Sequence, residues 1–480
     1  MSLSIAPDIS VLSVLTHIYL EPFTPPLPLL FCLIGAAATV LVTFALVVIF
    51  TSKLNLNLRS KPFRVNISSW GIARAFSSKP TLNAFRLIGV FVFILIIYAC
   101  FRGSDNPIYN IAPTFVWVIW WVGLAYLSAF VGDIWRLTNP WYSLFHWGEK
   151  LFITLSPSRS IEPFFKYPKR LGATPALLIF FAFAWVENIY HDSVVPLRIG
   201  QMIIIYSVIT WSGMIIFGKE IWLRNGEAFA VAFGFLAKFS PLEVQYNPIP
   251  SKNVSQTKIN LRIPGSGLIK TDSISTSQML FILLLLSAVT FDGLMGTMIW
   301  MRLQNSVIEY IPNLLVVGSL GLILVTLVFI GLYLCFSFLM NSFSGANYGT
   351  FTFANKFVTS LIPIALAYHV AHFLLFLLIQ GQLMIPLISD PFGQGWNLFG
   401  TENYRLNFKI MSPTFFWIIS VASIVMGHVI GVVVSHLIAV KTIRDRHKAF
   451  KSQYPMLALM IFYTIASLWI ITQPMYQSAM

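Results

Sequence analysis

Five ionisable side chains that could do chemistry lie inside long apolar stretches of the sequence. They are Glu187, Asp292, His369, His372 and His428. A spacing of three residues separates His369 and His372 by only about 60° around a helix, so both imidazoles face one side. Ionisable groups at membrane depth are costly and mark ligand sites, substrate paths or proton relays. These five residues are therefore the candidate site.

Imidazole combined with carboxylate suits zinc, copper or iron. We predict that His369, His372 and His428 ligate a transition metal, whose identity the residues leave open. Asp292 would be a fourth ligand or would orient one, and Glu187 would act as general base toward a metal-bound water. Two alternatives stay open: neutral hydrogen bonds between helices, and a relay for protons or ions.

Depth along the helices supports one shared site. At about 1.5 Å per residue, His369 and His428 fall near the midplane of their spans. His372 and Asp292 come about one turn further outward and Glu187 about a turn and a half. We therefore expect the site in the outer half of the membrane.

The composition identifies the protein as all-α and membrane-integral. Only 10% of the 480 residues are charged and 57% are hydrophobic, and the mean hydropathy is +0.77. Soluble domains carry about 25% charged residues, and apolar runs of about 20 residues cross a bilayer as helices. We predict a single membrane domain, 1–480, with about ten transmembrane helices. The predicted spans are 24–50, 87–101, 112–132, 173–190, 198–218, 276–300, 313–340, 355–381, 413–440 and 455–473.

Basic residues gather in four loops on one side of the predicted bundle. Loop 51–86 holds seven Lys and Arg, 133–172 six, 219–275 seven and 441–454 five, whereas loops on the other side hold at most two each. The positive-inside rule places these four loops in the cytoplasm and both termini outside. We predict a multi-pass protein of the inner (cytoplasmic) membrane. The net charge of +14 then faces anionic lipid and not nucleic acid.

Three segments outside the spans carry further expectations. Residues 219–240 combine leading charges with an apolar remainder, which predicts an interfacial or re-entrant helix, with Glu220 and Glu227 facing water or pairing with nearby cations. Residues 241–275 are predicted to be a cytoplasmic polar loop. The outward segment 382–412 is rich in aromatic residues, Pro and Gly, which predicts an ordered cap or an aromatic anchor at the membrane interface.

Four motifs resemble a family of bacterial multi-pass membrane proteins, some members of which are labelled fenitrothion hydrolase. The motifs are GDIWRLTNPW (132–141), LIPIALAYHVAHFLLFLLIQGQ (361–382), SDPFGQGWNLFG (389–400) and SQYPMLALMIFYTIASLW (452–469). The resemblance covers most of the chain and is densest from about residue 132 onward. It implies phosphotriester hydrolysis, for which a metal-bound water would be a suitable nucleophile.

The leading hypothesis from sequence is a metal-dependent membrane hydrolase, with its site beneath the 382–412 segment. The competing hypotheses are a transporter or permease for a metal ion, proton or small amphiphile, and an accessory subunit whose histidines only pack. The expected partners are the lipid bilayer, a small-molecule or ion substrate, and a membrane or periplasmic subunit.

Overall fold

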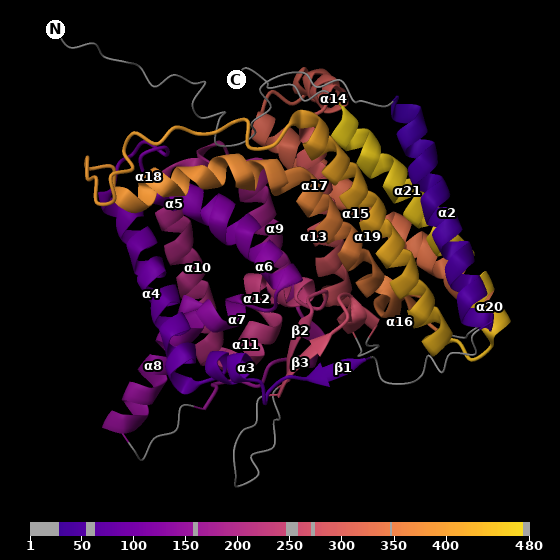
Figure 1. The fold of residues 1–480 in the computed structure, drawn as a ribbon, viewed down its shortest axis with the longest axis horizontal. Coiled ribbons are helices and arrows are strands. Elements are labelled where there is room, and N and C mark those ends of the chain that lie inside the picture. The colour runs from indigo at the N-terminus through magenta and orange to yellow at the C-terminus, as the bar shows by residue number, and fades with distance from the viewer. Residues whose placement is uncertain are drawn as a thin grey trace.

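A computed structural model describes residues 28–53, 63–156, 162–245, 258–269, 274–345 and 348–473. Ten helical runs within these residues are long and apolar enough to cross a membrane. The prediction of an all-α polytopic bundle is thereby confirmed (Figure 1). The main helices of these runs are α2 (Leu29–Lys53), α4 (Lys79–Arg102), the continuous α5 (Ile111–Pro113), η1 (Thr114–Gly123) and α6 (Leu124–Phe130), α9 (Thr174–Asn188), α10 (Pro196–Phe217), α13 (Thr276–Met295), α15 (Leu314–Ser344), α17 (Ile362–Gln380) with α16 (Thr350–Phe357) before it, α19 (Pro413–Thr442) and α21 (Gln453–Thr472).

Shorter elements connect these helices. The short helices are α3 (Gly71–Phe76), α7 (Trp135–Thr138), α8 (Pro140–Leu155), α11 (Lys219–Asn225), α12 (Ala228–Leu236), α14 (Met298–Ile308), α18 (Met384–Ser389) and α20 (Arg446–Lys451). Single turns are η2 (Lys169–Leu171), η3 (His191–Val194), η4 (Ser266–Ile269), η5 (Val358–Leu361) and η6 (Gly381–Leu383). The strands are β1 (Arg64–Asn66), β2 (Leu242–Gln245) and β3 (Lys258–Arg262).

Local signals in the sequence start the long helices. The Ser275 side chain accepts from the backbone N–H of Gln278, whose own side chain accepts from the Ser275 N–H, and this capping box begins α13. Ser412 caps α19 ahead of Pro413 in the first turn, where proline needs no N–H donor. These caps satisfy backbone donors that the first turn of a helix leaves open.

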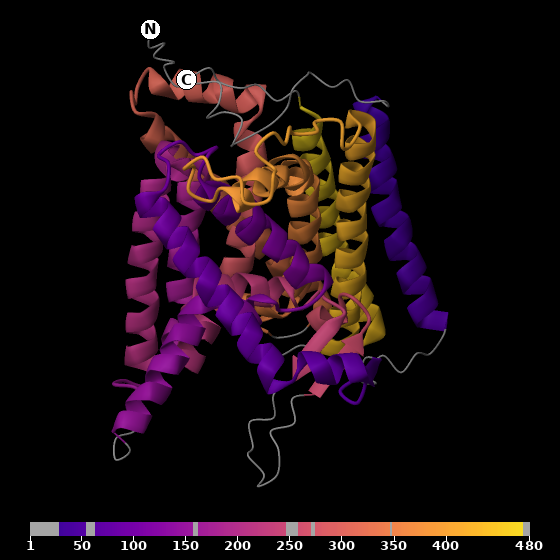
Figure 2. The same cartoon turned by 60° about the vertical axis from the view of Figure 1, so that its left-hand side comes forward.

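The α13 helix lies at the centre of the bundle, in contact with α9, α15, α17 and α21. In its apolar window 78% of residues are buried, compared with 11% in α2 at the periphery. An apolar helix in a membrane can face lipid, as α2 does, so the burial of α13 reflects its central position among the other helices. Figure 2 shows α2 set against α19 and α21 at the edge of the bundle. Asp292 therefore enters the interior on the most buried helix.

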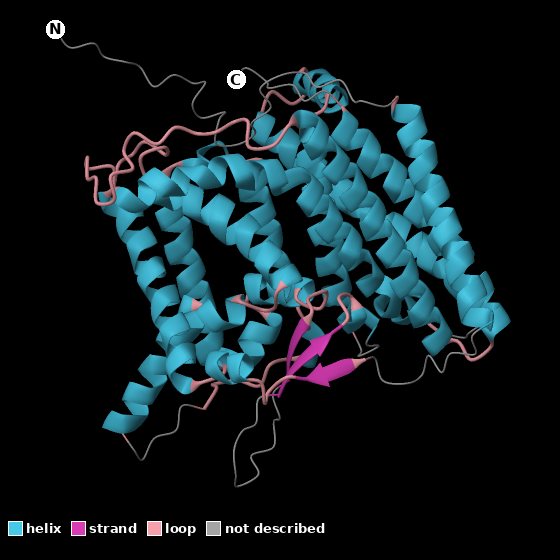
Figure 3. Cartoon of the chain, in the orientation of Figure 1, coloured by secondary structure: helices cyan, strands magenta, loops and turns pink. Residues whose placement is uncertain are grey.

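The strands form a small antiparallel sheet in the order β1-β3-β2 at one end of the bundle, which we call the sheet face (Figure 3). β2 and β3 belong to the segment 241–275, of which residues 246–257 and 270–273 lie outside the described part. A buried ion network holds the sheet together. Glu243 pairs with Arg64 (Nε–Oε2, 2.9 Å) and with Arg262 (Nη1–Oε1, 3.5 Å).

The segment 382–412 lies at the opposite end, which we call the cap face. Its turns are fixed by Asp390, whose carboxylate accepts from the backbone N–H groups of Gln394, Gly395 and Trp396 at 3.0, 2.7 and 3.2 Å. The Gln382 side chain accepts from Tyr404 Oη at 3.0 Å. The beginning of α2 and the end of α21 also lie at this face (Figure 1).

Residues 219–240 form two helices, α11 and α12, that begin near the sheet face and pack among the membrane helices. α11 contacts α9 and α10, and α12 contacts α6, α9 and α17. Most of α12 is buried, including Phe229 and Phe233. The chain thus re-enters the bundle here without crossing it.

Candidate functional site

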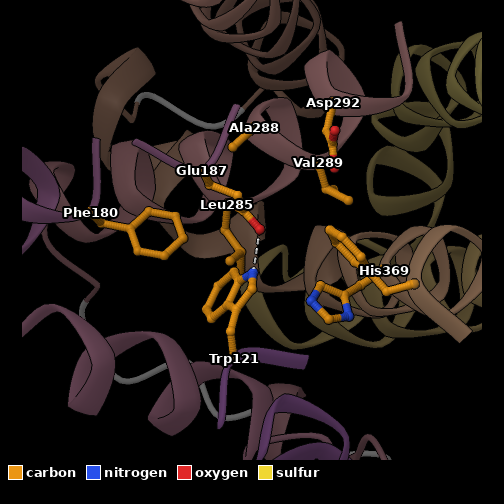
Figure 4. A pocket seen from close by; sticks show the side chains of 9 residues that line it. Trp121, Phe180, Glu187, Leu285, Ala288, Val289, Asp292 and His369 are labelled. Atoms are coloured by element: carbon orange, nitrogen blue, oxygen red, sulfur yellow. Dashed lines mark hydrogen bonds between the residues drawn. The ribbon is translucent and has the colours of Figure 1, made fainter. Parts of the chain in front are cut away.

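A small cavity within the bundle is lined by three of the five candidate residues. Glu187 from α9, Asp292 from α13 and His369 from α17 face it together with Trp121, Phe180, Leu285, Ala288, Val289 and Phe373. Figure 4 shows the three polar side chains directed toward the same space from different elements. The cavity encloses about 10 Å³, roughly the space of one water molecule.

A π-helix shapes one wall of this cavity. Residues Thr114–Gly123 form η1, a ten-residue π-helical stretch, and such wide turns are rare and concentrate at functional sites. The stretch carries Trp117, whose Nε1 donates to Ser193 O at 2.9 Å, and Trp121, which faces the cavity. The altered helical pitch therefore positions the indole that contacts the candidate site.

Glu187 accepts a hydrogen bond from Trp121. The distance from Trp121 Nε1 to Glu187 Oε1 is 2.6 Å, and Figure 4 marks this bond. Glu187 lies in the last turn of α9 and is partly buried. His191, three residues past that helix, is exposed and does not line the cavity. One carboxylate oxygen of Glu187 is thus held in place beside the cavity by a neutral donor.

Asp292 and His372 form a buried pair. His372 Nε2 lies 2.8 Å from Asp292 Oδ2, and their side chains are only 3% and 9% exposed. A ring N–H donating to a carboxylate fixes the orientation of the imidazole. The pair joins the central helix α13 to α17, so a membrane-depth acid is fixed by a neighbouring helix.

His369 lies one turn before His372 and has different surroundings. Its ring is packed by aromatic side chains, with centroid distances of 4.7 Å to Phe373, 5.5 Å to Tyr126 and 5.8 Å to Trp121. Neither ring nitrogen has a hydrogen-bond partner among the described residues. A buried polar group without a partner is rare and calls for a functional explanation. His369 therefore presents a free imidazole at the cavity.

His428 lies apart from this cavity. Its Nδ1 donates to Ile424 O, one turn earlier in α19, at 2.8 Å, and it does not line the cavity. Within the described residues, no three or more His, Cys, Asp or Glu side chains are grouped so that they could hold a metal ion. The predicted metal ligation by His369, His372 and His428 stays a prediction without support from this geometry.

A further carboxylate, Glu227, is buried inside the bundle. The prediction that it faces water or pairs with a nearby cation is wrong, because the residue is 0% exposed and its hydrogen-bond partners are neutral. Lys219, a cation of the same segment, pairs with Glu149. The charges at the start of 219–240 favoured a water-facing position for Glu227. The apolar run FAVAFGFL, which follows Glu227, indicates instead that the chain enters the bundle here.

Fold and site together define a polytopic α-helical membrane protein with an acid–imidazole cluster between its helices. No family model, curated protein or solved structure matches the chain. The resemblance to the bacterial family stays a prediction on its four motifs alone.

Proposed function

We propose that this protein is a proton-coupled membrane transporter and that the cavity between Glu187, Asp292 and His369 is its protonation site. The observation that carries the proposal is the convergence of two carboxylates and a free imidazole on one water-sized, otherwise apolar cavity. Chains of Asp, Glu and His at membrane depth are typical of proton relays.

Electrostatics favours proton exchange at this site. Two negative charges facing one apolar cavity repel each other strongly, since little solvent screens them. A proton on Glu187 or Asp292 removes that repulsion, and His369 offers a second acceptor within the same lining. The size of the cavity supports the same conclusion, because pockets for organic ligands usually measure roughly 300–1,000 Å³.

The proposal predicts that the cavity carboxylates move charge when the external pH changes. In proteoliposomes adsorbed on a solid-supported membrane, a pH jump should give a transient current from the unmodified protein. The double variant Glu187→Gln/Asp292→Asn should strongly reduce the current, because both amides keep the shape of the site but cannot bind a proton, and only His369 remains in the cavity as an acceptor.

A matched control removes a carboxylate elsewhere. Glu309 is exposed beyond α14, so Glu309→Gln should leave the current unchanged. Equal currents from the double variant and the unmodified protein, with both proteins folded, would show that the cavity is not the protonation site. Absence of current in the unmodified protein would remove the support for proton-coupled transport.

A metal-dependent hydrolase is the second candidate, as the sequence motifs imply. The observation that favours it is the hydrogen bond between Asp292 and His372, since a carboxylate commonly orients a metal-ligating histidine. His369 and His372, with or without the more distant His428, would then be the ligands, and Glu187 the base.

Metal content tests the second candidate directly. If the protein is a metalloenzyme, inductively coupled plasma mass spectrometry of protein purified without chelators should find about one equivalent of a transition metal. A folded His369→Ala/His372→Ala variant should lose that metal together with any phosphotriester hydrolysis. Failure to find metal in the unmodified protein would reject this candidate.

A further inference from the structure

Glu227 is a carboxylate held entirely inside the protein by neutral donors. Its oxygens accept from Tyr206 Oη, Trp135 Nε1 (3.3 Å) and Asn139 Nδ2 (3.4 Å), and from the backbone N–H groups of Phe229 (3.2 Å) and Ala230 (2.7 Å). No Lys, Arg or His among the described residues forms an ion pair with it. Glu227 is therefore a fully buried carboxylate, with five hydrogen-bond donors, that lies outside the cavity.

Capping of α12 does not by itself account for this residue. Glu227 accepts from the first N–H groups of α12, a role that the neutral side chains of Ser, Thr and Asn fill well. A carboxylate adds the large cost of removing a charge from water. Burial raises the pKa of the Glu227 carboxyl, and the hydrogen bonds from Tyr206, Trp135 and the backbone oppose that rise. Both protonation states thus have support from the surroundings.

Among the described residues, Tyr206 is the titratable side chain that forms a hydrogen bond with Glu227. α10 brings the Tyr206 hydroxyl, while α7 and the residue after it bring the neutral donors Trp135 and Asn139. The charged residues of α11 are Lys219, Glu220 and Arg224, and of these Lys219 is paired with Glu149. The Tyr206 hydroxyl is therefore the group placed to exchange a proton with Glu227.

An aromatic layer separates Glu227 from the cavity. Trp121, which donates to Glu187, has its ring centroid 6.3 Å from that of Phe229, whose N–H donates to Glu227. Phe233 adds a second contact with Trp121 at 6.2 Å. The rings of Phe229 and Phe233 can neither donate nor accept a proton, so a proton that moves between the two carboxylates needs water as its carrier.

We infer that Glu227 is a second proton-binding site, positioned across this aromatic layer from the cavity, and that protons cross the protein by passing between the two sites. The inference rests on the proposed function. It adds a second proton-binding site to a proton path in which the cavity provides the first.

The step at Glu227 is a proton transfer without any change of oxidation state. The Tyr206 oxygen accepts a proton as its own O–H proton passes to the Glu227 carboxylate, leaving a neutral tyrosine and a neutral carboxylic acid. Release is the reverse. The proton reaches Tyr206 on a water molecule, as hydronium, after a cavity carboxyl, Glu187 or Asp292, has transferred it to that water.

The test separates proton binding at one side from passage across the membrane. In full-length protein, Glu227→Gln should keep the pH-jump current of the cavity but lose sustained proton flux into liposomes carrying a pH-sensitive dye and a valinomycin-imposed potential. Tyr206→Phe, which keeps the ring and removes the hydroxyl, should also lose the flux. Glu220→Gln, on exposed α11 surface, should behave as the unmodified protein.

Infrared difference spectra between high and low pH supply a second readout that does not require transport. The unmodified protein should show a protonated carboxyl band that disappears in Glu227→Gln and persists in Glu187→Gln/Asp292→Asn. If Glu227→Gln does not fold, the band should instead shift in Tyr206→Phe, because its hydrogen-bond partner is gone.

Two results would overturn the inference. One is sustained flux in folded Glu227→Gln or Tyr206→Phe at the unmodified rate. The other is the absence of any carboxyl band sensitive to Glu227 or Tyr206. If the unmodified protein shows neither pH-jump current nor flux, it is the proposed function that fails, and the infrared band then decides separately whether Glu227 binds a proton.

Discussion

Arg262→Met is expected to destabilise the protein by about 3–5 kcal/mol, the usual cost of breaking a buried ion pair by removing one partner. The Arg262 side chain is 6% exposed and shares the Glu243 carboxylate with Arg64. Its Nε donates to Ser240 O at 2.9 Å and its Nη2 to Ala237 O at 2.6 Å. Methionine keeps the apolar stem but leaves these acceptors without their donor.

The position of Arg262 explains why the effect should reach the interior. Ala237 is the C-terminal cap residue of α12, so the guanidinium joins the sheet to the end of the re-entrant helix. We expect a lower midpoint of thermal unfolding, followed by tryptophan fluorescence in detergent, and faster proteolysis within 241–262. Lys258→Met, at an exposed position of the same strand, is the matched control. Equal midpoints for the two variants would contradict the assigned role.

Gly89→Ala is expected to separate α4 from α7 and to cost about 1–3 kcal/mol, as overpacking of a close contact does. A Cβ at Gly89 would lie 1.9 Å from Thr138 O and 2.8 Å from Thr138 C. Both atoms belong to the backbone, so no side-chain rotation relieves the clash. Because Asn139, the next residue, donates to Glu227, the shift should also disturb that site.

The measurement compares two glycines of membrane helices. A Cβ at Gly331, in α15, would meet nothing within 4 Å, so Gly331→Ala should leave the unfolding midpoint unchanged. Gly89→Ala should lower it and weaken the infrared band assigned to Glu227. An unchanged midpoint in Gly89→Ala would mean that α4 and α7 are not held at the contact distance described.

The sequence by itself determined the membrane class and the number of spans. Apolar runs of sufficient length fold as helices in a bilayer whatever their neighbours, because each backbone N–H and C=O finds its partner within the same helix. Boundaries shifted where caps and turns intervene: the span predicted as 276–300 ends as α13 at Met295, and α14 follows from Met298. Helical depth also placed Glu187, Asp292 and His369 within about a turn and a half of one another, and these three line one cavity.

Only the tertiary structure decided which of these groups meet. His428 has the depth of His369, yet its position around α19 directs its bonded ring nitrogen to Ile424 of its own helix. Glu227 follows a charged, water-facing pattern along the chain, yet α7, α10 and α12 enclose it completely. Helical periodicity fixes how far along a helix a side chain lies, whereas its partners depend on how each helix is rotated and which helices adjoin. The rotation of each helix and its neighbours are set by packing among segments far apart in the sequence, which a local sequence pattern does not specify.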